Sequence, residues 1–262
     1  MYGMFYTNRS AMEAQQNKLD LISNNIANVG TIGYKKLSST FQDLYTSSLE
    51  RLGVPTSEDA DTKLYIGTGV KSTNEVRVKT QGSLVDTKLS TDLAIDGEGL
   101  FKVYKQDGSV AYTRNGNFKV DAAGTLVDNN GYRLSITDAN GNEINVPGGP
   151  INFSKDKFSI DANGALSLDN NGNVIKVGDI KTYETVGDKG FISAGQSLFV
   201  PVEGATVMET TKRNIYQGFT ENSNVDISTE MTDMIVAQRA FQLSSSALRT
   251  ADDMWQMINN LR

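Results

Sequence analysis

The sequence predicts an α+β protein in which helices at the two ends of the chain bracket a β-rich middle. Helix breakers are concentrated centrally: all four prolines lie between Pro55 and Pro201, and the stretch after Gly218 contains neither Gly nor Pro. Apolar residues recur every seven positions near both ends, whereas short alternating segments fill the middle. We expect a helical domain from residues 1–34 and 224–262, a connector at 35–63 and a β-rich domain at 64–223.

The N-terminal end carries a heptad pattern that predicts an amphipathic helix. Its apolar positions are Phe5, Met12, Leu19, Ile22, Ile26 and Val29, and the polar Asn8 and Gln15 interrupt the inner positions. Gly30 and Gly33 follow the pattern, as glycine often follows a helix. Ser10 and Glu13 have the spacing of a capping box, which would either start the helix or lie within a longer one.

Three asparagines near the end of this helix, Asn24, Asn25 and Asn28, are unusual because Asn is a poor helix former. They predict either a solvated polar face or a ladder of contacts between neighbouring copies of the chain.

The C-terminal end carries a longer heptad pattern. A helix from 227 to 261 would be about 50 Å long at about 1.5 Å per residue, and Asp226 or Ser228 would cap its start. The seam consists of Ile227, Met234, Phe241, Leu248 and Trp255, with Ala237, Ser244, Ala251 and Ile258 at the second position; Ala240, Ala247, Met254 and Leu261 widen it on one side. Such helices pack within their own domain, pair with each other, or pair with other copies.

The middle of the chain reads as short strands. A turn at 96–99 precedes a strand at 100–104, and apolar residues alternate with polar ones at 132–136 and 158–160. Asn115-Gly116 lies between residues 110–114 and 117–120, which predicts a hairpin with a type I′ turn.

Five Asp-x-x-Gly segments, at 121–124, 128–131, 138–141, 161–164 and 169–172, suit type I turns with Gly at a positive φ. A calcium site is disfavoured, because each turn offers one carboxylate and the spacing is irregular. The segments are interpreted as turns.

Composition excludes many kinds of chemistry. The chain has no His and no Cys, which removes the commonest general base and the usual zinc ligands. Its net charge of −6 argues against nucleic acid or an anionic membrane as partner. Asp96 and Glu98 are a close carboxylate pair, but a turn explains them better than a glycosidase site. Two Gly-x-Gly fragments, at 67–69 and 97–99, lack the rest of a nucleotide-binding motif. We therefore expect no catalytic residue, cofactor or metal.

Several segments resemble the signatures of the bacterial flagellar rod and hook protein family. They are AQQ at 14–16, LDLISNNIANV at 19–29, TIGYK at 31–35, DLAIDGEGLF at 92–101, YTRNGNF at 112–118, QGFTENSNV at 217–225, EM at 230–231 and AQRAF at 237–241. The blocks span both ends and the middle in the family's order. Within the family, the chain length, FQDL at 41–44 and IGTGV at 66–70 most resemble distal-rod members.

The resemblance implies a structural subunit of the flagellar basal body that transmits motor torque. Terminal helices would form the inner layer of a helical filament, the β-rich domain would face outward, and the two seams would pair and then bury against neighbouring subunits. The expected partners are other copies of the chain, adjacent proximal rod and hook subunits, ring proteins around the rod, and the type III export apparatus. The N-terminus lacks the pattern of a secretory signal, so we expect export without a cleaved signal peptide.

The expected assembly residues are the apolar positions of both helices and the three asparagines: Phe5, Met12, Leu19, Ile22, Asn24, Asn25, Ile26, Asn28, Val29, Ile227, Met234, Ala237, Phe241, Leu248, Ala251, Trp255 and Ile258. Two alternatives stay open: a proximal rod or hook subunit of the same family, and a secreted β-rich carbohydrate-binding module or enzyme with helical ends.

Overall fold

The computed structural model describes residues 2–48, 65–138, 140–146, 153, 158–170, 173–187, 190–210 and 213–260. The chain divides into two compact units. Unit 1 contains residues 1–27, 37–76 and 226–262, and unit 2 contains residues 28–36 and 77–225. Helices at the two ends bracket a β-rich middle, which confirms the predicted fold class.

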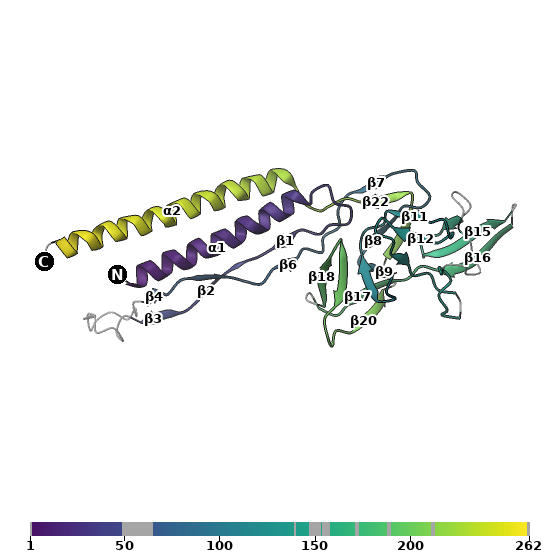
Figure 1. Ribbon diagram of the computed structural model, residues 1–262, viewed down its shortest axis with the longest axis horizontal. Coiled ribbons are helices and arrows are strands. Elements are labelled where there is room, and N and C mark those ends of the chain that lie inside the picture. Colours follow the sequence, from purple (N-terminus) through teal and green to yellow (C-terminus); the bar gives the residue numbers. More distant parts are fainter. Residues whose placement is uncertain are drawn as a thin grey trace. The chain divides into compact units, whose positions relative to one another are not determined.

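Unit 1 is built on two long helices, α1 (Tyr2–Ala27) and α2 (Ile227–Asn260). They pack against each other in antiparallel orientation, with the two chain ends at the same end of the pair (Figure 1). The predicted span of the C-terminal helix agrees with α2. Asp226 caps α2, because its carboxylate accepts hydrogen bonds from the Ser228 amide at 3.1 Å and the Thr229 hydroxyl at 2.8 Å.

The N-terminal helix is shorter than its heptad pattern predicts. Asn28 and Val29 lie beyond the end of α1, and the Thr31 amide donates to the Asn28 carbonyl at 3.1 Å to close a turn. The pattern continued past the helix because apolar spacing alone does not detect where a turn begins. Ser10 lies inside α1 and caps nothing; its hydroxyl donates to the Thr7 carbonyl at 2.9 Å.

Short antiparallel strands complete unit 1; β1 to β3 lie in the segment predicted as a connector, and β4 to β6 lie at the start of the segment predicted as β-rich. β2 (Phe41–Asp43) pairs with β5 (Val70–Ser72), and β3 (Thr46–Ser48) pairs with β4 (Tyr65–Gly67). β1 (Leu37–Ser38) and β6 (Val76–Arg77) flank these pairs in the sequence. α1 packs on this side as well, since the Val70 amide donates to the Ser10 hydroxyl at 3.2 Å.

Unit 2 is a β domain. In the described part of the chain its largest sheet has nine strands, and it runs β11 (Phe118–Val120), β12 (Leu126–Asp128), β13 (Arg133–Leu134), β9 (Leu100–Tyr104), β10 (Val110–Thr113), β19 (Leu198–Pro201) and β18 (Phe191–Gly195), with β17 (Thr182–Thr185) joining β9 to β20 (Val207–Thr210). A three-stranded sheet runs β14 (Phe158–Ile160), β15 (Ala165–Asn170) and β16 (Asn173–Asp179). Two further pairs are β8 (Leu93–Gly97) with β21 (Arg213–Gln217), and β7 (Leu84–Asp86) with β22 (Phe219–Glu221).

One hydrophobic core holds these sheets together. Phe101 and Phe118 meet edge to face at its centre, with ring centroids 5.7 Å apart. Inward residues alternate along β9, where Phe101 and Val103 are buried and their neighbours are partly exposed. The other buried members include Leu93, Ile95, Leu126, Leu134, Ile136, Leu166, Ile180, Leu198 and Ile215.

Four of the five predicted Asp-x-x-Gly turns are confirmed. The glycine amide donates to the aspartate carbonyl at 2.7–2.9 Å in each, and all four glycines have positive φ: Gly124, Gly131, Gly141 and Gly164. The fifth segment, 169–172, lies partly outside the described residues. The predicted strand at 100–104 is confirmed as β9, and Gly99 has a φ of 119° in the turn before it.

The predicted hairpin around Asn115-Gly116 is wrong. β10 pairs with β9 and β19, whereas β11 pairs with β12. Gly116 instead crosses close to Leu93, whose amide donates to the Gly116 carbonyl at 2.9 Å. A Cβ atom at Gly116 would lie 1.5 Å from the Leu93 carbonyl oxygen, so glycine is present for close backbone approach.

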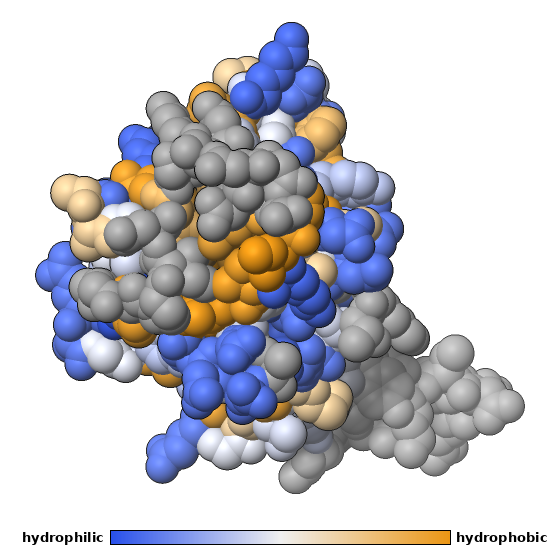
Figure 2. Space-filling view, turned by 90° about the vertical axis from the view of Figure 1, so that its right-hand side faces the viewer, coloured by the Kyte–Doolittle hydropathy of each residue, from blue (hydrophilic) through white to orange (hydrophobic). Residues whose placement is uncertain are grey.

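The surface of unit 2 mixes apolar and hydrophilic side chains. Figure 2 shows one face, on which an orange apolar area is bordered by hydrophilic groups.

No helix in the described part of the chain is long and apolar enough to cross a membrane.

Candidate assembly surface

The N-terminal assembly residues predicted from the sequence are distributed unevenly. In α1, Ile22 and Asn25 are buried, Phe5, Met12, Leu19 and Ile26 are half-buried, and Asn24 is exposed. Asn28 and Val29 are half-buried in unit 2, beyond the end of the helix. The structure therefore brings most of the apolar α1 positions onto one side of the helix and separates the three asparagines.

The C-terminal assembly residues follow α2 with burial greatest in the middle. Ala237 and Ala251 are buried, whereas Met234, Phe241 and Leu248 are half-buried. Ile227, Trp255 and Ile258, at the two ends of the helix, are 43%, 39% and 51% exposed. The α1–α2 contact covers the middle of the predicted seam and leaves apolar side chains uncovered at its ends.

Exposed apolar side chains on α2 extend the side on which Ala240, Ala247 and Met254 were predicted to widen the seam, and the sequence prediction did not include Val236, Leu243 and Met257 there. We call Val236, Leu243, Met254 and Met257 the outer stripe; all four side chains are exposed, Leu243 by 71%. Ala240 and Ala247 lie between them on the same side of the helix at 100° per residue. The heptad interval from Val236 to Leu243 was the available signal, but the stronger seam beside it masked that signal.

The buried Asn25 makes a specific polar contact inside the helix pair. Its Nδ2 donates to Glu230 Oε2 at 3.1 Å and to the Leu37 carbonyl at 2.9 Å, and its Oδ1 accepts from the Leu37 amide at 2.9 Å. Asn25 and Glu230 are each 1% exposed. Neither a solvated face nor a ladder between copies describes this residue, because its amide is used within unit 1.

Four of the sequence blocks quoted above, at 31–35, 92–101, 112–118 and 217–225, meet inside unit 2 around a buried charge cluster of Lys35, Arg114 and Glu221. Arg114 Nε and Lys35 Nζ donate to the Glu221 carboxylate at 2.5 and 2.6 Å, and the Gly82 amide donates at 2.9 Å. The Arg114 guanidinium also donates to the carbonyls of Ile95, Gly97 and Gly99. The cluster therefore ties five separate chain segments together.

Electrostatics in this cluster favour the charged carboxylate. Burial raises the pKa of Glu221, but the neighbouring Arg114 charge and the Lys35 hydrogen bond lower it more, so the net pKa is below its ordinary value of 4.5. Burial lowers the pKa of Lys35, which the Glu221 hydrogen bond partly offsets.

Gly33 brings the segment after α1 against this cluster. Its φ is +69°, its amide donates to the Glu221 carbonyl at 2.7 Å, and an added Cβ would lie 2.6 Å from the Arg114 carbonyl carbon. The glycine in the TIGYK block is thus required both by backbone conformation and by close approach.

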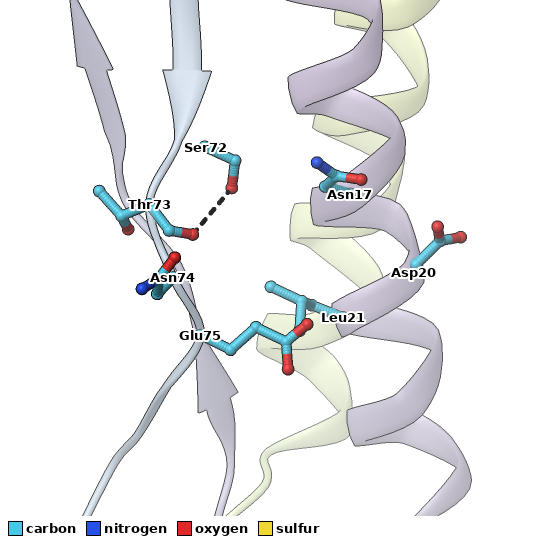
Figure 3. Close-up of a pocket in the computed structure, with 7 residues that line it drawn as sticks. All are labelled: Asn17, Asp20, Leu21, Ser72, Thr73, Asn74 and Glu75. Carbon is cyan, nitrogen blue, oxygen red and sulfur yellow. Dashed lines mark hydrogen bonds between the residues drawn. The ribbon is translucent and has the colours of Figure 1, made fainter. Parts of the chain in front are cut away.

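A pocket of about 530 Å³ lies in unit 1 beside α1 (Figure 3). Asn17, Asp20 and Leu21 line it from the helix, and residues 72–75 line it from the opposite side. In the described part of the chain no three His, Cys, Asp or Glu side chains are grouped as a metal site would need. The pocket is open, and its lining is polar apart from Leu21.

Models of three known protein families together match most of the chain. The model for the Flagella basal body rod protein matches residues 5–35, that for the Flagellar hook protein FlgE/F/G D1 domain matches 94–174, and that for the Flagellar basal body rod FlgEFG protein C-terminal matches 216–261. These matches include both helices and the first part of the large sheet.

Individual relatives align over the whole length. The flagellar basal-body rod protein FlgG of Buchnera aphidicola subsp. Schizaphis graminum is 34% identical over 271 residues, covering 100% of both chains. The FlgG proteins of Borreliella burgdorferi and Bacillus subtilis are also 34% identical and cover 99–100% of each chain. The flagellar hook-basal body complex protein FlhP of Bacillus subtilis is 29% identical over 273 residues. Together with two terminal helices that bracket a β domain, these matches show that the chain belongs to the flagellar basal-body rod FlgEFG family, as a structural subunit of the basal body.

Proposed function

We propose that the chain is a distal rod subunit that polymerises through its terminal helices into the shaft that transmits motor torque to the hook. The observation that carries the proposal is the outer stripe of α2, which stays exposed while α1 covers the neighbouring seam. Exposed contiguous apolar side chains mark interaction surfaces. The full-length similarity to FlgG proteins supports the distal assignment over a proximal rod or hook subunit.

A second copy is the partner that suits this surface. The outer stripe has the heptad spacing that helices use to pack on other helices. Burying one Leu side chain contributes roughly 1.5–3 kcal/mol, so repeated contacts along a filament would sum to a stable shaft. A helical filament requires contacts between two different surfaces of each subunit, because identical surfaces facing each other close into a dimer.

The remaining assignments follow from this role. The helical domain at 1–34 and 224–262 would form the inner layer, the connector at 35–63 would lead outward, and the β domain at 64–223 would face the surroundings. Proximal rod and hook subunits would contact the two ends of the polymer, and ring proteins would surround it. The type III export apparatus would deliver the chain without a cleaved signal. Torque would pass through packed contacts, with no catalysis, cofactor or nucleic acid.

The test compares Leu243→Asp in the outer stripe with Gln242→Asp, an exposed neighbour, in cells that lack the native gene. L243D is expected to abolish swimming and rod formation, because a charge would be buried at the contact, whereas Q242D is expected to retain both. Phe241→Asp and Leu248→Asp are expected to block assembly while unit 2 stays folded. Electron microscopy of isolated basal bodies measures rod formation, and circular dichroism checks folding. Normal rods from L243D would refute the stripe as an assembly surface.

The distal assignment has a separate test. Cells without this chain are expected to build a rod that stops short and carries no hook. A complete rod that lacks only the hook would instead identify the chain as a hook subunit.

A further inference from the structure

The apolar heptads of α2 leave its pairing with α1 underdetermined. Small residues recur at the seven-residue interval at Ala237, Ser244 and Ala251, and larger apolar residues recur at the same interval beside them. A slip of α1 by one heptad, about 10 Å along the helix, would therefore find similar apolar partners. The outer stripe offers a further apolar face.

The Asn25–Glu230 contact breaks this degeneracy. Both side chains are 1% exposed, and the Nδ2 of Asn25 divides its two hydrogens between Glu230 and the Leu37 carbonyl. A one-heptad slip would bring Ala237 to the place of Glu230, so one buried N–H of Asn25 would lose its acceptor. A buried donor without an acceptor is costly, whereas the apolar contacts would hardly change.

Leu37 extends the effect from the helices to the chain that follows them. Its amide and carbonyl both bond the Asn25 side chain, at 2.9 Å each, so Asn25 also fixes where the backbone of β1 meets α1. One amide side chain thus sets the position of α2 and of β1 against the same turn of α1.

We infer that the buried Asn25–Glu230 pair is a register determinant that selects the seam and the alignment with which α2 packs on α1. A polar pair in an apolar seam adds specificity through the penalty on wrong alignments. Replacing both residues with leucine makes the pair apolar, so that it can still pack in the seam, and it removes that penalty.

Asn8 on the same helix supplies a matched control. It lies at a polar interruption of the α1 heptads, and its buried Nδ2 has no hydrogen-bond partner among the described residues. Asn8→Leu is therefore expected to leave the register unchanged, although it makes the same chemical change as Asn25→Leu.

Disulfide trapping reads the register directly, because the native chain has no cysteine. Ala11 lies two heptads before Asn25, and Ser244 lies two heptads after Glu230, so these positions are level in an antiparallel pair. Ala11→Cys is combined in turn with Ser244→Cys for the native register and with Ala237→Cys or Ala251→Cys for slips of one heptad. Each pair is oxidised in the purified full-length chain and in isolated rods, and the intramolecular product is measured by non-reducing electrophoresis.

The native, N8L and E230Q backgrounds are expected to favour the Ala11–Ser244 combination, since Gln keeps an acceptor oxygen for Asn25. The N25L/E230L background is expected to shift product to a slipped combination by one heptad. If that variant does not accumulate, Glu230→Leu alone serves, because it leaves both bonds to Leu37 intact.

Two results would overturn the inference. One is the native preference for the Ala11–Ser244 disulfide in N25L/E230L, and the other is the lack of any preferred disulfide in the native background, either in the purified chain or in isolated rods. Loss of rods with slipped product in the soluble chain supports it, and loss of rods with the native product contradicts it. The inference rests on the proposed function only in its predictions for isolated rods. A wrong assembly surface would leave the pattern in the purified chain intact, so the two failures are distinguishable.

Discussion

At the scale of single residues, Glu221 and Gly33 account for much of why the quoted sequence blocks occur together. Glu221 is 1% exposed and neutralises one of two buried cations, Lys35 and Arg114. Removing one partner of a buried ion pair leaves an uncompensated charge, which costs far more than breaking an exposed pair. The cluster is consequently expected to control the stability of unit 2.

Glu221→Gln is expected to lower the free energy of unfolding of unit 2 by about 3–5 kcal/mol, because two buried cations lose their counter-charge. Glu209→Gln is the matched control. Glu209 pairs with Lys181 at 2.9 Å, but both side chains are about 40% exposed, so the expected loss is below about 1 kcal/mol. Urea denaturation monitored by far-ultraviolet circular dichroism measures the free energy of unfolding of both variants. Equal losses would contradict the importance of the buried cluster.

The same cluster predicts acid sensitivity. The pKa of Glu221 is lower in the folded chain than its ordinary 4.5, so the folded state binds fewer protons than the unfolded state in that range. The stabilisation is therefore fully present above about pH 4.5 and is lost as pH falls through the lower folded-state pKa. Urea denaturation at a series of pH values from 7 to 3 should show this loss in the free energy of unfolding of the native chain. The E221Q variant should lack the part of the pH dependence that comes from Glu221.

Gly33→Ala is expected to destabilise unit 2, because an L-residue at φ +69° is strained and its Cβ would meet the Arg114 backbone. Gly30→Ala is the control, since no atom lies within 4 Å of the added Cβ and its φ is not positive. Thermal denaturation should separate the two variants. A Gly33→Ala protein as stable as the Gly30→Ala protein would mean that the backbone relaxes freely there.

At the scale of elements, α2 begins at a well-formed cap and carries more apolar surface than α1 alone covers. The seam toward α1 buries Ala237 and Ala251, yet the outer stripe and the helix ends stay exposed. Long helices gain most of their stability from burying an apolar face rather than from propensity. α2 is thus suited to a further packing partner.

The start of α2 depends on its cap. Asp226→Ala is expected to reduce stability by about 1 kcal/mol, because the Ser228 amide and the Thr229 hydroxyl lose their acceptor. Asp226→Ser should recover most of that loss, since serine is also a good cap. Helix content against temperature measures the effect, and an Ala variant as stable as the Ser variant would show that the cap is dispensable.

At the scale of the whole molecule, two units with different contents carry different roles. Unit 2 has a continuous hydrophobic core and the buried charge cluster, so it has the elements of an independently stable domain. Unit 1 relies on two long helices and short strands, and its helices present apolar surface for further contacts. We expect the α1–α2 pair to form but to open readily in the free subunit, and to be held closed on assembly.

Limited proteolysis of the purified chain tests this expectation. Both ends should be removed rapidly and leave a resistant core near residues 64–217, and the same ends should resist cleavage in isolated rods. Mass spectrometry of the fragments locates the cuts. Equal resistance from end to end in the free chain would mean that the α1–α2 contact alone orders the helices, and it would weaken the assembly proposal.

The sequence by itself determined the order of elements, the family and the span of α2, because heptad spacing, glycine and proline placement and local turn chemistry act over a few residues. Four Asp-x-x-Gly turns and β9 followed for the same reason. Tertiary structure alone decided what Asn25, Gly116 and Arg114 do. Asn25 acquires its role from Glu230, Gly116 leaves the expected hairpin to approach Leu93, and Arg114 is buried against Glu221. Each of these contacts joins residues far apart in the chain, and no local pattern encodes such pairings.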